Sequence, residues 1–216
     1  MKLHCDQNNN SIGELVNLLD RKRAVLLAGA GCGAGLGYPD WLGLLDRIQK
    51  KLELQITFDP RIDVKDAAEQ IKAKSRERWG GDERYHRCIR EEFQPKTPPY
   101  LDFHLNLVSL GFAGITTTNY DTALENAVPA AFFKERIACN EINLCDKEER
   151  YRVLAYLGSL GHSENLQNIL HLHGCYKPPQ NIVLTRSDYE RYYGKPQDSL
   201  GQGSQPDNFR TPDIEL

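Results

Sequence analysis

Residues 24–41, AVLLAGAGCGAGLGYPDW, decide the fold of this 216-residue chain. The apolar run at 24–28 predicts a strand in the centre of a parallel sheet. A loop with glycine at every second position from 29 to 37 follows it, and Pro39 then opens a stretch with the apolar spacing of a helix. A strand, a glycine-rich loop and a helix in this order predict a cradle whose backbone N–H groups close on a phosphate.

Composition limits the class of protein. The chain is 40% hydrophobic and 26% charged, which fits one globular domain, and its net charge of −3 argues against a general nucleic-acid binder. Its six cysteines show no C-x-x-C spacing, and the chain is too large and rich in core residues to be a disulfide scaffold. The N-terminus has no apolar leader, and no apolar run approaches the ~18 residues that cross a bilayer. We expect a reduced, cytoplasmic protein without membrane or nucleic-acid partners.

The periodicity along the chain predicts alternating strands and helices. A capping-box pattern at residues 11–14 predicts a short helix that packs against the first strand. Further helices are expected at 41–52, 65–78, 82–93, 100–110 and 148–157, with a short one carrying Leu124 and Ala127. Strands are expected at 24–28, 114–118, 168–173 and 181–185. This order predicts a three-layer, Rossmann-like α/β fold with a mostly parallel sheet and a helical insertion. Residues 1–193 would form the domain, and residues 194–216 a disordered or loosely packed tail.

Polar residues follow three of the expected strands. The glycine-rich loop follows the first, Asn119 and Asp121 follow the second, and His173 follows the third. Because parallel sheets bind ligands beyond the carboxyl ends of their strands, these three clusters should converge on one cleft.

Simpler interpretations stand beside each motif. The glycines could form only a flexible turn, and Asn119 and Asp121 only an Asx turn with a helix cap. The alternation of His171, His173 and Cys175 permits a zinc site, although His171 alone is better explained as a hydrogen-bonded structural residue. Three tyrosines are spaced for one helix face that packs the edge of the sheet. They are Tyr189, Tyr192 and Tyr193.

Together the motifs resemble the sirtuin-type NAD-binding family, in the divergent branch found in bacterial defence proteins. Residues 29–31 and the segment GYPDW at 37–41 are similar to the family's glycine loop and its G-I-P-D-F segment. Residues 117–121, TTNYD, resemble its T-Q-N-x-D motif, and His173-Gly174 resembles its catalytic His-Gly pair. The resemblance covers about residues 20 to 193.

The resemblance implies that NAD is the substrate and that the nicotinamide–ribose bond is cleaved. Asn119 would hold the ribose hydroxyls or a water, His173 would act as general base or orient the ribose, and Asp121 would lie near the nicotinamide amide. Nicotinamide leaves as a neutral base, so no acid–base carboxylate pair is needed. The resemblance assigns NAD binding to Gly29, Ala30, Gly31, Pro39, Asp40, Trp41, Thr118 and Asp121, and it implies no metal.

The chain departs from the family pattern in four places. Gly33 stands where the family has serine, Trp41 where phenylalanine is usual, and the two C-x-x-C pairs of the zinc-containing deacetylases are missing. Residues beyond Gly194 show no further strand and no adenosine-side loop, so we expect a domain that is C-terminally incomplete relative to the family. Protein deacetylation is therefore not expected.

Three hypotheses follow. The first is an NAD glycohydrolase that yields ADP-ribose and nicotinamide in a defence or NAD-depletion setting, with a homo-oligomer or a sensor protein as partner. The second is a non-catalytic module that binds NAD or ADP-ribose, motivated by Gly33 and the missing strand. The third is a metal-dependent hydrolase that uses His171 and His173.

Overall fold

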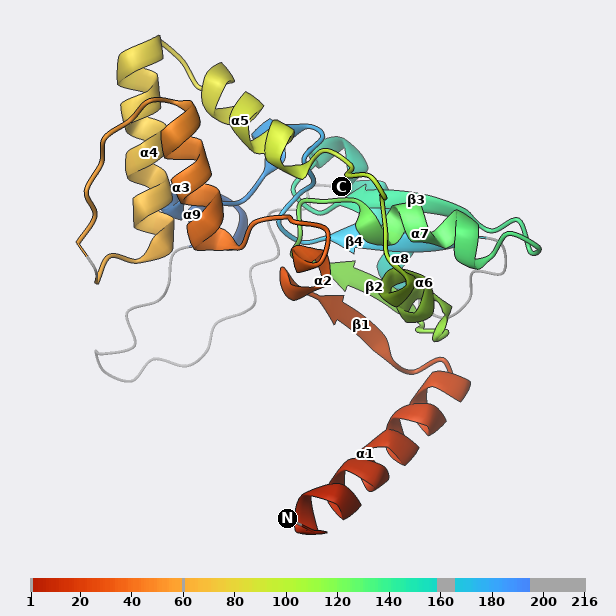
Figure 1. Ribbon diagram of the computed structural model, residues 1–216. Helices are drawn as coiled ribbons and strands as arrows, with labels where there is room; N and C mark the ends of the chain where they lie inside the picture. The colour runs from red at the N-terminus through yellow and green to blue at the C-terminus, as the bar shows by residue number, and fades with distance from the viewer. Residues whose placement is uncertain (1, 60, 159–165, 195–216) are drawn as a thin grey trace, which may run out of the picture.

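A four-stranded sheet forms the centre of the molecule. The computed structural model describes residues 2–59, 61–158 and 166–194, without the side chains of residues 2–9. The strands are β1 (Val25–Ala28), β2 (Gly114–Thr117), β3 (Ala138–Asn143) and β4 (Leu166–His171). They are ordered β1-β2-β4-β3, and every neighbouring pair is parallel (Figure 1). The predicted parallel sheet is confirmed.

Helices alternate with these strands along the chain. They are α1 (Lys2–Asp20), α2 (Gly31–Ala34), α3 (Trp41–Lys51), α4 (Val64–Trp79), α5 (Glu83–Phe93), α6 (Asp102–Ser109), α7 (Ala123–Ala131), α8 (Arg150–Gly158) and α9 (Arg186–Tyr193). Two single 3₁₀ turns, η1 (Lys147–Glu149) and η2 (Pro179–Asn181), join them. The predicted helices at 41–52, 65–78, 82–93, 100–110 and 148–157 are confirmed within a few residues.

Helices cover both faces of the sheet. On one face, Ile115 and Ile169 are buried in a cluster with residues of α6 and α7. On the other, the hydroxyl of Tyr156 from α8 donates to the Ile115 carbonyl at 3.0 Å and lies 3.2 Å from the hydroxyl of Thr116. The predicted three-layer arrangement is confirmed.

A second group of helices, α3, α4, α5 and α9, lies beyond one end of the strands (Figure 1). Its core includes the fully buried side chains of Leu44, Ile48, Ile71 and Ile89. Ion pairs join its members: Lys51 and Arg47 both reach Glu92 between α3 and α5, and Arg186 of α9 pairs with Asp66 of α4. This group is the predicted helical insertion, completed by α9 from the end of the domain.

The sequence prediction of a strand at 181–185 was wrong, and the strand β3 was missed. Ile182, Val183 and Leu184 are buried, but they connect η2 to α9. The Val183 N–H donates to the His173 carbonyl, and the Val183 carbonyl accepts from the Tyr120 hydroxyl. An apolar run therefore became a buried connection. In contrast, β3 reads ACNEIN, and its polar residues suit an edge strand that is buried mainly at its end.

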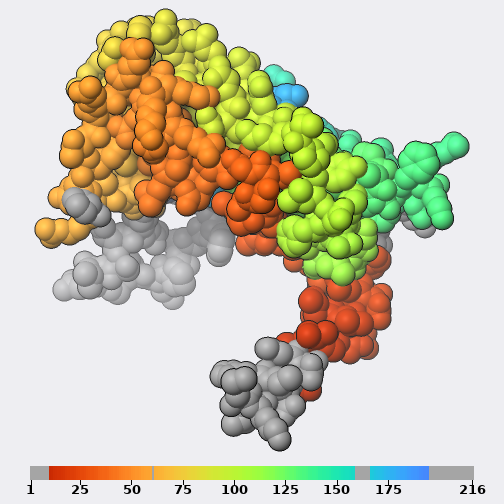
Figure 2. All heavy atoms as spheres, in the orientation of Figure 1, coloured from red at the N-terminus to blue at the C-terminus, as the bar shows by residue number. Residues whose placement is uncertain are grey.

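The first helix also differs from its prediction. Residues 11–14 lie inside α1, so no capping box begins a helix there. The helix projects from the body instead of packing against the first strand, and Leu15 is 43% exposed (Figures 1 and 2). Strand β1, predicted to be central, is an edge strand of the described sheet. Its Leu27 is 65% exposed, because α8 covers that face of the sheet only over the other strands.

The predicted tail, 194–216, falls almost wholly outside the described residues. Within the described part of the chain, no helix combines the length and apolar character needed to cross a membrane.

Candidate functional site

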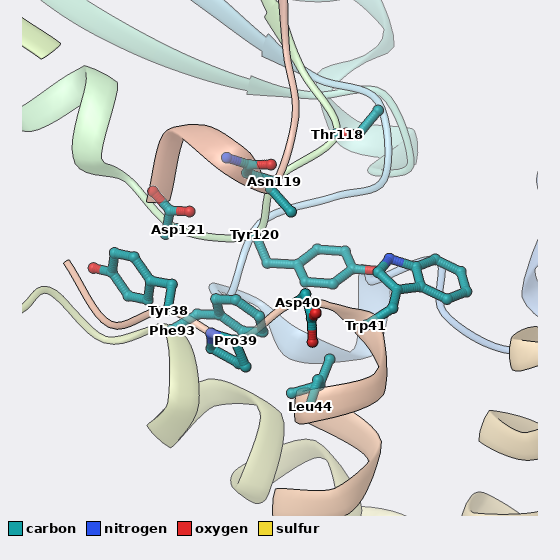
Figure 3. A pocket seen from close by; sticks show the side chains of 11 residues that line it. Tyr38, Pro39, Asp40, Trp41, Leu44, Phe93, Thr118, Asn119, Tyr120 and Asp121 are labelled. Atoms are coloured by element: carbon teal, nitrogen blue, oxygen red, sulfur yellow. The ribbon is translucent and has the colours of Figure 1, made fainter. Parts of the chain in front are cut away.

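A pocket lies between the carboxyl ends of β1 and β2 and the helical group. Its hollow holds about 390 Å³ of space, open solvent included. Figure 3 shows Thr118 and Asn119 near the glycine-rich loop, and Asp40 and Leu44 at the start of α3. The lining residues come from four segments of the chain and are Ala30, Tyr38, Pro39, Asp40, Trp41, Leu44, Phe93, Thr118, Asn119, Tyr120 and Asp121.

The glycine-rich loop turns into α2 directly after β1. The backbone N–H groups of Ala30 and Gly31 donate to no other described residue, whereas the N–H of Cys32 is bonded to the Gly29 carbonyl. On the far side, the buried His104 of α6 donates from Nε2 to the Cys32 carbonyl at 2.9 Å, because its Nδ1 accepts from the Leu101 N–H. The loop is thus held from behind, and two amides stay available at its front.

Gly33 packs tightly within this loop. A Cβ atom at this position would lie 3.0 Å from Oδ2 of Asp121 and 3.1 Å from the ring of Tyr38. A serine here, as in the family pattern, would therefore push on the pocket carboxylate. The departure at Gly33 goes with the close approach of Asp121 to the loop.

The β2–α7 loop carries the polar side chains. The hydroxyl of Thr117 accepts from the Asn119 N–H at 3.0 Å and donates to the Ala28 carbonyl, which ties this loop to β1. Asp121 is buried, and its Oδ1 accepts from the Ala123 N–H at the start of α7. Burial raises the pKa of the Asp121 carboxyl above its usual value, and the neighbouring Glu125 adds to the effect.

Aromatic rings form one wall of the pocket. Tyr38 and Phe93 are stacked with ring centroids 5.9 Å apart, and Phe93 meets Tyr120 edge to face at 5.1 Å. Trp41 stands at the start of α3, where the Asp40 side chain caps the helix by accepting from the Gly43 N–H at 2.8 Å. This cap fixes the position of Trp41.

His173 lies beside this pocket and does not line it. Its ring meets Tyr189 at 5.3 Å and Tyr193 at 6.0 Å between centroids, and Tyr189 in turn lies 6.2 Å from the ring of Trp41. Its Nε2 is 3.4 Å from the Tyr189 hydroxyl, and its buried Nδ1 has no hydrogen-bond partner among the described residues. Burial lowers the pKa of His173 below 6.5, so the ring is neutral at neutral pH.

The structure therefore brings most of the predicted site residues together. Those in the pocket wall are Ala30, Pro39, Asp40, Trp41, Thr118, Asn119 and Asp121. Gly29 and Gly31 flank Ala30 without lining the pocket. His173 is also outside the lining, and its ring contacts Tyr189, which in turn contacts Trp41. The three clusters lie in one region, but only two of them share the hollow itself.

The arrangement does not favour a metal at His171 and His173. Nδ1 of His171 lies 2.8 Å from the Asn119 carbonyl, and its Nε2 lies 2.7 Å from Oε1 of Glu125, so both nitrogens are in use. The prediction that His171 is a hydrogen-bonded structural residue is confirmed. Among the described residues, no group of three His, Cys, Asp or Glu side chains is placed to hold an ion.

Sequence reasoning missed three kinds of residue at this site. Tyr189 was assigned to the edge of the sheet, but it stands between His173 and Trp41. Phe93, Tyr120 and Glu125 were not singled out from the sequence. Only Tyr120 gave a usable signal, since it lies inside the TTNYD motif.

Comparison with known proteins agrees with the resemblance seen in the motifs. Residues 113–207 match the family model described as SIR2-like domain. The chain is 25% identical over 171 residues to NAD(+) hydrolase ThsA of Bacillus cereus (strain MSX-D12), a match that covers 79% of this chain and 32% of the relative. The protein of the same name from Acinetobacter baumannii (strain 532279) is 26% identical over 181 residues, covering 84% and 33%.

A third relative of that name, from Enterococcus faecium, is 23% identical over 174 residues, covering 81% of this chain and 32% of the relative. The chain thus spans about a third of the length of the curated relatives it matches. The matched family model, these relatives and the parallel sheet agree with the motifs at residues 29–41, 117–121 and 173–174, and residues 113–207 are similar to a SIR2-like domain.

Proposed function

We propose that this chain is an NAD glycohydrolase, which cleaves NAD to ADP-ribose and nicotinamide. The observation that carries the proposal is the shared pocket. Asn119 and Asp121 lie in one hollow with Ala30, at the front of the glycine-rich loop, and with an aromatic wall. The names of the three relatives describe the same reaction class for those proteins.

Each part of the pocket suits a part of NAD. The backbone N–H groups of Ala30 and Gly31, which donate to no other described residue, are suited to bind the pyrophosphate, because backbone N–H groups in such loops bind anions. Flat rings stack on aromatic side chains, and the Phe93–Tyr120 wall offers such a surface for nicotinamide. Asp121, a buried carboxyl whose pKa is raised by burial, is suited to hydrogen-bond the carboxamide.

Asn119 and His173 take the catalytic roles. The transition state for loss of nicotinamide is a ribose with oxocarbenium character, so the site must orient the ribose and place a nucleophile. Asn119 is held rigidly by its backbone and would bind the ribose hydroxyls or a water. His173 is neutral, and its Nδ1 has no hydrogen-bond partner among the described residues, which suits a general base.

One observation favours a second function, the binding of NAD or ADP-ribose without cleavage. In the structure His173 lies outside the pocket wall, in ring contact with Tyr189, so the hollow offers its binding surfaces without the base. The defence setting, and activation by self-assembly or a sensor protein, belong to the proposal as well.

The test is incubation of the purified chain with NAD, followed by chromatography of the products. We expect nicotinamide and ADP-ribose to form in equal amounts. The same preparation is titrated with ADP-ribose in a calorimeter. Binding of ADP-ribose without any release of nicotinamide would replace the first function with the second. A chain that neither binds ADP-ribose nor releases nicotinamide would contradict both functions.

The pH dependence gives a second prediction. Burial of His173 disfavours its imidazolium, so its pKa in the folded chain is below 6.5, and the base is lost only when the pH falls through that lower value. We expect kcat/KM to be level at neutral pH and to fall on the acid side with a midpoint under 6.5.

The measurement is a pH–rate profile together with NMR titration of the His173 ring. The NMR signal is needed to distinguish His173 from Asp121, the pocket carboxyl whose pKa is raised. A His86→Ala chain is the matched control, since burial lowers the pKa of that histidine too but it lies on α5 outside the pocket. A rate midpoint that does not follow the His173 titration would contradict the assignment.

A further inference from the structure

A buried histidine at the end of β4 contacts the loop that carries Asn119. The His171 side chain is fully buried, and both of its ring nitrogens meet acceptors. Nδ1 lies 2.8 Å from the main-chain carbonyl of Asn119, and Nε2 lies 2.7 Å from Oε1 of Glu125 on α7. The Glu125 side chain is itself only 11% exposed. The chain of contacts therefore runs from a buried carboxylate through His171 to the backbone of a site residue.

The two acceptors define the state of the ring. A carbonyl oxygen only accepts, so Nδ1 of His171 carries a proton. The carboxylate of Glu125 also accepts, which favours a second proton on Nε2. Burial opposes a charged ring, but Glu125, with Glu141 of β3 and the Asn119 carbonyl, outweighs it and raises the pKa of His171 to about 9. Asp121 also interacts with this ring, and the buried thiol of Cys175, bonded to the Tyr120 carbonyl, has a raised pKa and stays neutral.

The peptide groups on either side of the Asn119 side chain are thus held from two strands. Its N–H donates to the Thr117 hydroxyl at the end of β2, and its C=O accepts from His171 at the end of β4. Thr117 and His171 are paired in the sheet register, so the two holding groups are neighbours. With both bonds made, the side chain of Asn119 leaves the loop in a fixed direction toward the pocket.

We propose that His171 is a positioning residue for NAD cleavage: held between Glu125 and the Asn119 carbonyl, it fixes the asparagine that holds the ribose. The effect of His171 on NAD cleavage rests on the proposed function. The ordering of Asn119 by His171 rests on the geometry alone. Histidines at active sites are commonly oriented by a carboxylate in this manner; here the oriented ring acts on a backbone carbonyl.

The test compares two replacements in a Glu125→Gln background, which removes the buried carboxylate charge. The amide nitrogen of asparagine takes the place of Nδ1 of histidine, and that of glutamine the place of Nε2. His171→Asn therefore keeps a hydrogen-bond donor to the Asn119 carbonyl. His171→Gln loses this donor, although its side chain has the same amide group as asparagine. We expect hydrogen exchange at the Asn119 amide and the loss in kcat to be about tenfold greater for His171→Gln, with KM changed little. Equal behaviour of the two variants would overturn the proposal.

The Glu125→Gln chain alone gives a second readout. Its glutamine can donate to Nε2 of a neutral His171, so the bond to Asn119 survives without the extra proton. NMR should show His171 titrating near 9 in the wild type and much lower in this variant. Because the folded pKa is raised, the stabilisation is complete below 6.5 and is lost as the pH rises through about 9, and this alkaline loss should vanish in the variant.

The outcomes separate the two proposals. If the wild type releases no nicotinamide, the proposed function fails, and the exchange of the Asn119 amide still decides whether His171 positions it. If the wild type turns over NAD and the two His171 variants exchange and react alike, the positioning role fails and the proposed function stands.

Discussion

A His173→Ala chain is expected to release nicotinamide from NAD about a hundredfold to ten-thousandfold more slowly than the wild type, the usual contribution of a positioned general base. The physical reason is that the neutral ring, whose Nδ1 has no hydrogen-bond partner among the described residues, is suited to take a proton. Since His173 does not line the hollow, its loss leaves the binding walls intact, and the affinity for ADP-ribose should change little. The measurements are kcat by product chromatography and Kd by calorimetry.

The contrast between rate and affinity is what makes this result informative. His86→Ala is the matched control, because it removes a half-buried histidine of lowered pKa from α5 and leaves the pocket untouched. Tyr189→Phe keeps the ring that covers His173 and removes only the hydroxyl 3.4 Å from Nε2. Full activity in the His173→Ala chain would contradict the catalytic role, and a parallel loss of ADP-ribose binding would make His173 a structural residue.

The framework of the fold was readable from local chemistry. The apolar strand, the glycine-rich loop and the Asp40 cap each follow from residues within a few positions of one another, and the structure has all three. What failed depended on partners distant in sequence. Residues 181–185 are as apolar and buried as a strand, but nothing in their own sequence shows that no strand lies beside them. The edge strand β3 was missed for the opposite reason. Its polar residues give no apolar pattern, although it pairs with β4.

For the site too, residues within a local motif were predicted, and residues that depend on distant contacts were not. The asparagine and aspartate of the TTNYD motif lie in the pocket as the motif and the parallel strands predict. Tyr189 and Glu125 could not be assigned, since their importance comes from what they touch: His173 for the one and His171 for the other. A tyrosine on an amphipathic helix and a glutamate in a first helical turn are common, and only the packing of α9 and α7 distinguishes these two.

A Gly174→Ala chain is expected to lose a large part of its folding stability. Gly174 follows His173 with φ +77°, in the left-handed region that side chains rarely adopt, which costs about 1–3 kcal/mol. A Cβ atom here would also lie 2.4 Å from the Asn181 carbonyl oxygen, a backbone atom that cannot turn aside. Overpacking of this kind costs about 1–3 kcal/mol more, so the sum approaches a sizeable share of the ~5–15 kcal/mol that holds a domain folded. Urea unfolding followed by circular dichroism measures the change.

Gly80→Ala separates the two causes. Gly80 ends α4 with φ +76°, almost the same backbone conformation, but a Cβ atom there meets nothing within 4 Å. It should therefore show the backbone strain alone, and the excess loss at Gly174 should report the clash with the 179–182 turn. That turn carries the chain into Val183, whose N–H holds the His173 carbonyl, so forcing it outward also moves the proposed base. Equal losses in the two variants would mean that the turn yields freely, and His173 would then have no fixed position from which to act.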